Sequence, residues 1–185
     1  MTFQMSSDPR LFMISRRTLV LSGAALITSV LPASAQSAGS NDPLAIVTAI
    51  YTRVSAGKGD SGGQFVWLEA KDRPRYLSKS LIALWAKADA NTPKGDEGPP
   101  GFDPITNSQD PEVKSFTVAT EARDSGTAVM AVTIKASQPR PHAADETVRY
   151  DFVRDGGHWK IDDIRGAIDG QPWSIRKLLS ESLKN

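Results

Sequence analysis

Residues 147–165 read TVRYDFVRDGGHWKIDDIR, and this stretch decides the fold. Apolar and polar side chains alternate on both sides of the Asp-Gly-Gly sequence, with Val148, Tyr150 and Phe152 before it and Trp159 and Ile161 after it. A period of two places each apolar set on one face of a strand, and an aspartate followed by two glycines favours a tight turn. The stretch therefore predicts an antiparallel hairpin with one apolar face.

Two segments upstream also have strand composition, residues 113–120 and 127–136, and Asp124-Ser125-Gly126 lies between them as a second turn. Together with residues 147–154 and 158–165 they predict an antiparallel sheet of about four strands. In the second segment the alternating apolar residues are Ala128, Met130, Val132 and Ile134. Such a face needs helices to cover it.

Three amphipathic helices are predicted around this sheet. Asp42 can cap a helix over residues 43–57, in which apolar residues recur at helical spacing. A second apolar stripe covers residues 77–88 after a serine-rich start, and a short C-terminal helix is expected over residues 174–183. Helices packed on an antiparallel sheet make an α+β domain.

An export signal is predicted before this domain. Arg16 and Arg17 give it a charged start, residues 19–30 form an apolar core, and Ala33-Ser34-Ala35 is a small-residue cleavage site. The arginine pair resembles the twin-arginine signal that a receptor of the export machinery reads, although ordinary secretory signals also contain such pairs. The core is too short to span a bilayer, so we expect cleavage after Ala35, no membrane span in the mature protein, and a periplasmic or secreted location.

Cleavage leaves about 150 residues, which is enough for one domain. We expect a signal peptide at 1–35, a flexible leader at 36–41 and a single domain at 42–185. The chain has 22 basic and 21 acidic residues, so its charge does not indicate nucleic-acid binding. It has no cysteine, and His142 and His158 lack the spacing of metal ligands, so no metal or cofactor is expected.

Two segments rich in glycine or proline are open to a functional or a structural interpretation. Gly-Asp-Ser-Gly-Gly at 59–63 is the string around the nucleophile of chymotrypsin-like proteases, but both histidines follow it instead of preceding it, which favours a flexible loop. Residues 91–111 contain five prolines and three glycines. They form either a functional loop or a solvated connection.

Asp163 is the carboxylate that the strand pattern singles out. It follows Trp159 and Ile161 by a period of two, so in a regular strand it points to the apolar face, where it lines a cavity or finds partners. Alternatively, the strand bulges or ends there, and Asp163 accepts hydrogen bonds from the backbone amides of a turn. Its neighbour Asp162 is expected to face solvent.

The chain also contains Phe102-Asp103-Pro104, Gln109-Asp110, and the segments 157–164 and 174–179. These motifs resemble the bacterial family called domain of unknown function 3828, over residues 43–180. That family is similar to the NTF2-like, or cystatin-like, superfamily, in which helices pack into the concave face of a curved antiparallel sheet and form a cone with an opening. The resemblance implies this cone here.

The resemblance also implies that Gln109, Asp110, Asp163 and Arg176 meet. They form either a ligand-binding group or a buried structural network. Buried polar residues are most often satisfied by their neighbours, which favours the network.

Three function classes follow. An exported, non-enzymatic module that binds a small ligand or another envelope protein is preferred, because no catalytic motif is recognisable. The second class is a small lyase, isomerase or hydrolase that uses a buried aspartate. The third is an immunity or inhibitor protein that docks the 91–111 loop on its target.

Overall fold

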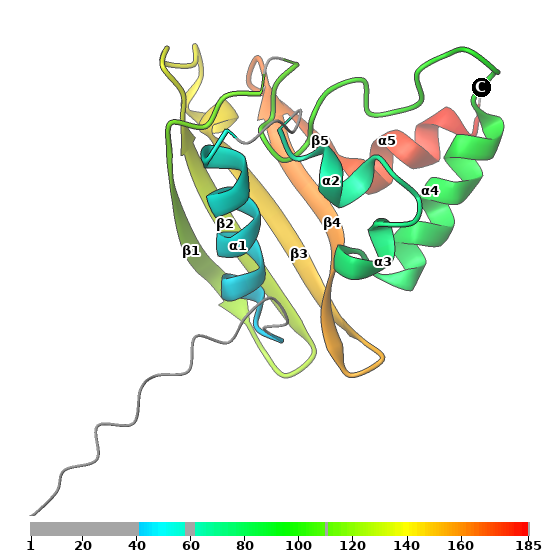
Figure 1. The fold of residues 1–185 in the computed structure, drawn as a ribbon, viewed down its shortest axis with the longest axis horizontal. Coiled ribbons are helices and arrows are strands. Elements are labelled where there is room, and N and C mark those ends of the chain that lie inside the picture. Colours follow the sequence, from blue (N-terminus) through cyan, green and yellow to red (C-terminus); the bar gives the residue numbers. More distant parts are fainter. Residues whose placement is uncertain (1–40, 58–61, 110, 185) are drawn as a thin grey trace, which may run out of the picture. The chain divides into compact units, whose positions relative to one another are not determined.

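A computed structural model describes residues 41–57, 62–109 and 111–184. It contains a five-stranded antiparallel sheet in which neighbouring strands follow the order of the chain (Figure 1). The strands are β1 (Ser115–Arg123), β2 (Thr127–Lys135), β3 (Thr147–Asp155), β4 (His158–Ile168) and β5 (Gln171–Ser174). The α+β class and the antiparallel order of the four predicted strands are confirmed. The predicted turn between β3 and β4 is also present, with positive φ angles at Gly156 and Gly157.

The fifth strand, β5, is not foreseen by the alternation pattern, because it has only four residues and contains Pro172. Asp169 and Gly170 have φ angles of 52° and 73° and turn the chain back onto β4. Trp173 then packs on Gly166, where an added Cβ atom would lie 2.7 Å from the indole ring. The lack of a side chain at Gly166 therefore lets the fifth strand pair in this position.

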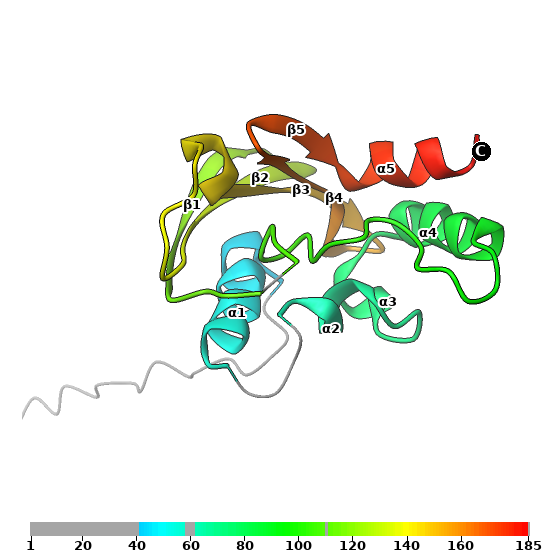
Figure 2. The same ribbon diagram turned by 90° about the horizontal axis from the view of Figure 1, so that it is seen from above.

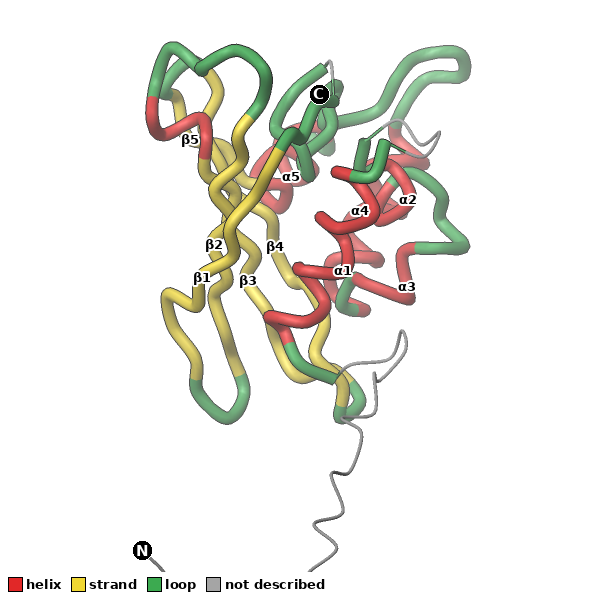
Figure 3. The backbone as a smooth tube through the Cα atoms, turned by 60° about the vertical axis from the view of Figure 1, so that its left-hand side comes forward, coloured by secondary structure: helices red, strands yellow, loops and turns green. Residues whose placement is uncertain are grey.

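The three predicted helices are α1 (Pro43–Ser55), α4 (Lys79–Asn91) and α5 (Ile175–Ser182). Their N-caps are Asp42, Ser78 and Ser174, whose side-chain oxygens accept hydrogen bonds from backbone amides of the first turn. Two one-turn helices, α2 (Gln64–Trp67) and α3 (Arg73–Tyr76), and a 3₁₀ turn at Ala143–Glu146 complete the elements. The sheet is curled, with α1 on its hollow side (Figure 2), and Figure 3 shows α2, α3 and α4 on the same side of the sheet as α1.

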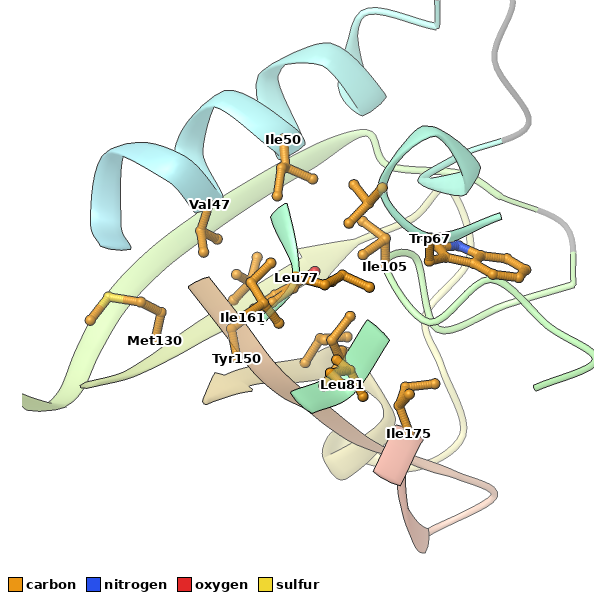
Figure 4. Close-up of a cluster of buried hydrophobic side chains, with 14 of the residues drawn as sticks. Val47, Ile50, Trp67, Leu77, Leu81, Ile105, Met130, Tyr150, Ile161 and Ile175 are labelled. Atoms are coloured by element: carbon orange, nitrogen blue, oxygen red, sulfur yellow. The ribbon is translucent and has the colours of Figure 1, made fainter. Parts of the chain in front are cut away.

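The hydrophobic core lies between the helices and the sheet (Figure 4). The predicted apolar faces of β2 and β3 are fully buried. Leu77, just before α4, forms a parallel bridge with Ile161 of β4, and Ile105 enters the same core from the long connection between α4 and β1. The core is thus filled partly by residues outside the regular elements.

Part of the predicted organisation lies outside the described residues. This applies to the export signal with Arg16, Arg17, Ala33 and Ala35, to residues 36–40, and to Asp110. Within the described ranges, no helix has both the length and the apolar character needed to cross a membrane.

The core assignment leads to a first prediction. Trp85 of α4 is 1% exposed, and its ring stacks on that of Trp67 with 5.8 Å between centroids. Trp85→Ala should lower the free energy of unfolding by about 3–5 kcal/mol, because it leaves a cavity in a closely packed core. Urea denaturation measures this. The matched control is Leu44→Ala at an exposed position of α1, and equal stability of the two variants would contradict the packing.

Candidate functional site

The carboxylate of Asp103 holds the long connection between α4 and β1 against the helices. Its Oδ2 accepts hydrogen bonds from the Gly63 amide at 2.7 Å and the Thr106 hydroxyl at 2.8 Å. Its Oδ1 accepts from the Trp67 indole Nε1 at 3.0 Å and the Ile105 amide at 3.1 Å. Asp103 is only 4% exposed. Four donors on one buried carboxylate make it a fixed anchor.

Gly62 and Gly63 let the backbone approach this anchor. A Cβ atom on Gly63 would lie 2.1 Å from the side chain of Ile105, and one on Gly62 would lie 2.3 Å from Asp103 Oδ2. Gly62 also has a φ angle of +61°, which favours glycine. Close packing therefore accounts for the last two residues of the Gly-Asp-Ser-Gly-Gly string, while Ser61 lies outside the described residues.

Asn107 fixes the far end of the same segment. It has a φ angle of 54° and is 4% exposed. Its Nδ2 donates to the carbonyls of Asp145 at 2.8 Å and Ala167 at 2.6 Å, and its Oδ1 accepts from the Trp173 Nε1 at 2.9 Å. All the hydrogen-bonding groups of this buried amide are thus engaged.

Arg140 clamps the carbonyl oxygens of this segment. Its guanidinium donates to Thr106 O at 2.6 Å, and to Asn107 O and Asp145 O at 2.8 Å each. Burial lowers the pKa of Arg140, partly offset by the charge of Asp145. Since the unperturbed pKa of arginine is far above neutral, the side chain stays charged and acts as a structural cation.

Tyr51 of α1 connects the segment to the sheet. Its hydroxyl donates to Ile105 O at 2.6 Å and accepts from the hydroxyl of Tyr150 at 3.0 Å. Burial raises the pKa of Tyr51 and of Tyr150 above the ordinary range, so both hydroxyls stay protonated and serve as donors. The segment 103–108 is therefore hydrogen-bonded to helices, strands and turns.

A pocket of about 810 Å³ opens beside this anchored segment, between α2 and the connection before β1. Trp67, Leu68 and Phe102 contribute apolar surface to it, and Leu68 is 44% exposed. Asp103 lies in its wall. The pocket has the size of small-molecule sites, and its wall is fixed by the hydrogen bonds described above.

Four polar side chains also line the pocket: Gln64, Gln109, Asp96 and Glu97. In the described part of the chain, none of the four has a hydrogen-bond or ion-pair partner. No lysine, arginine or histidine belongs to the described lining. The pocket therefore offers two amide groups and two carboxylates to a ligand, on a partly apolar surface.

The structure describes three of the four predicted site residues. Gln109 lines the pocket, and Asp110 lies outside the described residues. Asp163 and Arg176 lie together where β4 meets the start of α5. Within the described chain, no hydrogen bond joins Gln109 to either of them. The expected meeting of all four residues thus stays a hypothesis, and the structure shows contact between Asp163 and Arg176.

Asp163 is held by a β-bulge and a helix start. The register of β3 and β4 shifts between Asp151 and Phe152, which leaves an extra residue on β4. Asp163 Oδ1 accepts from the amides of Ile164 at 2.9 Å and Arg176 at 3.0 Å, and Oδ2 accepts from the Ser174 hydroxyl at 2.6 Å. Burial raises the pKa of Asp163, although these hydrogen bonds act in the opposite direction.

Asp162 does not face solvent freely, so this expectation is wrong. It is half-buried, and its Oδ1 accepts from the hydroxyl of Ser78 at 2.5 Å and from Arg176 at 2.5 Å. Arg176 also donates to the carbonyl of Asp162 at 2.6 Å and to Ser80 at 3.0 Å. The bulge turns this side chain toward the starts of α4 and α5, which the period of two does not foresee.

Sequence reasoning missed Asp103, Asn107 and Arg140 as organising residues. One local signal was available, because Ile105 follows Asp103-Pro104, precedes Thr106-Asn107 and is the one aliphatic residue in the connection 91–111. Such a residue is expected to enter the core, and the flanking side chains then have to satisfy the buried backbone. The partners Gly63 and Arg140 are distant in sequence and gave no signal.

The described residues contain no group of three or more histidine, aspartate or glutamate side chains placed to hold a metal ion. No known protein family, curated protein or solved structure matches the chain. The site is therefore interpreted from its own geometry.

The anchor role of Asp103 gives a second prediction. Asp103→Ala leaves two amides, an indole and a hydroxyl without an acceptor, so the free energy of unfolding should fall by about 3 kcal/mol or more. Asp96→Ala is the control, because this exposed carboxylate has no partner among the described residues and should change stability by less than about 0.5 kcal/mol. Chemical denaturation compares the two, and a cost below about 1 kcal/mol for Asp103→Ala contradicts the anchor.

The raised pKa of Asp163 gives a third prediction. A carboxyl whose pKa is higher in the folded than in the unfolded state stabilises the fold fully below its unfolded pKa, and this contribution is lost as pH rises through the folded pKa. The stability of the wild type relative to Asp163→Asn should therefore decrease from about pH 4 to pH 7.

Asp124→Asn is the control of opposite sign. Hydrogen bonds from the Thr127 and Gly126 amides lower the pKa of Asp124, so its contribution is present above the unfolded pKa and lost as pH falls. The advantage of the wild type over this variant should increase with pH. Urea titrations at several pH values measure both trends, and trends of the same sign would show that burial does not control Asp163.

Proposed function

We propose that the protein is an exported, non-enzymatic binding protein whose ligand enters the pocket beside Asp103. The observation that carries the proposal is the combination of a fixed wall with free polar groups. The wall is built by the four hydrogen bonds of Asp103, whereas Gln64, Gln109, Asp96 and Glu97 line the same pocket without partners in the described chain. Preformed pockets with a few unpaired polar groups are typical of ligand sites.

The ligand class follows from the charges of the pocket. Asp96 and Glu97 contribute two negative charges, and no cationic side chain of the described lining balances them. Leu68 and Phe102 provide an apolar surface beside them. These groups suit a ligand with an amine or guanidinium group attached to an apolar portion, such as an amphiphilic amine or a basic peptide side chain.

The hydrogen bonds of the buried Asp103 carboxylate support a binding role over a catalytic role. Both oxygens of Asp103 already accept two hydrogen bonds each, so this residue is poorly placed to exchange a proton with a ligand. Export by a twin-arginine-like signal, membership of the domain of unknown function 3828 family and an NTF2-like cone belong to the same proposal. They rest on the sequence motifs.

The second candidate function is that of an enzyme, and one observation favours it. Asp163 is buried and burial raises its pKa, as a general acid or base requires. Its carboxylate is bonded to two backbone amides and a hydroxyl, and it does not belong to the pocket lining. The observation therefore fits a structural role at the start of α5 at least as well.

The fourth prediction tests the pocket with a matched pair of probes. Phenethylamine and 3-phenylpropionate carry the same ring and opposite charges. In ¹H–¹⁵N NMR titrations, phenethylamine should shift the amides of Leu68, Gly98 and Phe102 with a dissociation constant of about millimolar, as expected for so small a ligand. 3-Phenylpropionate should shift them far less.

Two variants distinguish the contribution of charge to probe binding from the contribution of apolar contact. Glu97→Gln should weaken phenethylamine binding and reduce the preference over 3-phenylpropionate, whereas Phe102→Ala should weaken the binding of both probes. Lys184→Ala, at an exposed position outside the pocket, is the control. Equal shifts by both probes, or shifts that do not involve the pocket amides, would overturn the ligand class.

A further inference from the structure

The two edges of the sheet differ in how well they are protected from pairing with a strand of another chain. β5 forms one edge, with four residues, a proline and an immediate continuation into α5. Short edge strands and prolines prevent pairing with other chains. β1 forms the other edge and has nine residues (Figure 1). Its backbone hydrogen bonds within the described chain go to β2 alone. Among the described residues, the outward-facing amides and carbonyls of β1 therefore have no backbone partner.

The protecting features of β1 are confined to its second half. The register with β2 shifts between Thr120 and Ala122, and the two charged residues Glu121 and Arg123 lie in the same part. Residues 115–120 read SFTVAT, with no charge and no proline. Their aromatic and β-branched side chains favour strands. This half has the features of a strand edge that pairs with another strand.

We propose that β1 pairs antiparallel with β1 of a second copy of this chain, through residues 115–119 and around a two-fold axis at Thr117. The two five-stranded sheets then form one continuous ten-stranded sheet. Thr117 lies opposite its own equivalent, Phe116 opposite Val118, and Ser115 opposite Ala119. This proposal is independent of the ligand pocket.

The register follows from the faces of the strand. A two-fold axis perpendicular to the joined sheet places the same face of both copies on the same side. Because side chains alternate between the faces, each residue then lies opposite a residue whose number differs from its own by an even number. Ser115, Thr117 and Ala119 are exposed, whereas Phe116 and Val118 are half-buried on the other face. With the axis at Thr117, the exposed residues of the two strands lie opposite one another. Phe116 of each copy lies opposite Val118 of the other, and such aromatic to β-branched pairs stabilise antiparallel strands.

The charges at the two ends of the uncharged half are balanced. Glu112 and Lys114 lie before it, and Glu121 and Arg123 lie after it. Glu121 and Arg123 also have partners of opposite charge within the chain, Arg149 and Asp42. An edge with balanced charges repels neither end of an identical strand, so β1 of a second copy fits it electrostatically. The formal net charge of the chain is only +1, so two copies approach without strong overall repulsion.

Single cysteines test the proposal directly, because the chain contains none. Opposite residues in an antiparallel pair have Cα atoms about 4.5–5.5 Å apart, within the range of a disulfide. Thr117→Cys in the purified protein should therefore oxidise to a covalent dimer at least about tenfold faster than Ser125→Cys, at an exposed turn position. A mixture of Ser115→Cys and Ala119→Cys should form mixed dimers in preference to either homodimer.

Sedimentation velocity without cysteines completes the test. The wild type should show a monomer–dimer equilibrium, and Thr117→Lys should raise its dissociation constant about tenfold or more by placing two lysines across the axis. Ser125→Lys should leave the equilibrium unchanged. A wild type that stays monomeric at all concentrations overturns the proposal. So does a dimer in which Thr117→Cys oxidises no faster than Ser125→Cys, or a strand of another protein on β1.

Discussion

The buried carboxylate of Asp103 is the interaction on which the loop side of the protein depends. A carboxylate removed from water is costly unless donors replace the lost solvent, and here four donors from two parts of the chain do so. Two of them, Gly63 and Trp67, lie 40 and 36 residues away in sequence. The same bonds that satisfy Asp103 therefore hold α2 against the segment 103–108. Ile105 enters the core as a consequence, and the pocket acquires a fixed wall.

Two adjacent carboxylates of β4, Asp162 and Asp163, set the starts of α4 and α5. The extra residue at the bulge of β4 lets two adjacent side chains serve different partners. Asp162 bonds Ser78, the N-cap of α4, and Asp163 bonds Ser174, the N-cap of α5. Arg176 contacts both carboxylates, through its guanidinium and its amide. One irregularity in a strand therefore positions two helices.

The sequence predicted the elements whose signals are periodic and local. Alternation in β2 and β3, the Asp-Gly-Gly turn and the capped helices α1, α4 and α5 follow from residues within a few positions of one another. β5, α2 and α3 are too short to show a period, each having four residues. The bulge at Asp162 gave wrong expectations for that side chain, since one inserted residue reverses the faces of a strand.

Most of the candidate site could not be predicted, because it is made by contacts between distant segments. Arg140 reaches carbonyls 33 and 34 positions away, and a guanidinium bound to carbonyls has no sequence motif. Gln109 was selected by resemblance and lies in the pocket, whereas no motif singled out Asp96 and Glu97. The composition of the 91–111 loop was open to a functional or a structural interpretation, and it did not indicate which residues line the pocket.

The pocket and the free edge of β1 are linked by a continuous series of contacts. The ring of Phe116 in β1 lies 5.4 Å from that of Tyr51, Tyr51 donates to Ile105 O, and the Ile105 amide donates to Asp103 in the pocket wall. None of residues 115–119 lines the pocket, so the proposed ligand binding and the proposed strand pairing involve separate surfaces. Contiguity alone does not amount to coupling. If pairing at Phe116 changes the affinity of the pocket, the ligand must change the pairing by the same factor, because the two equilibria share the same four states.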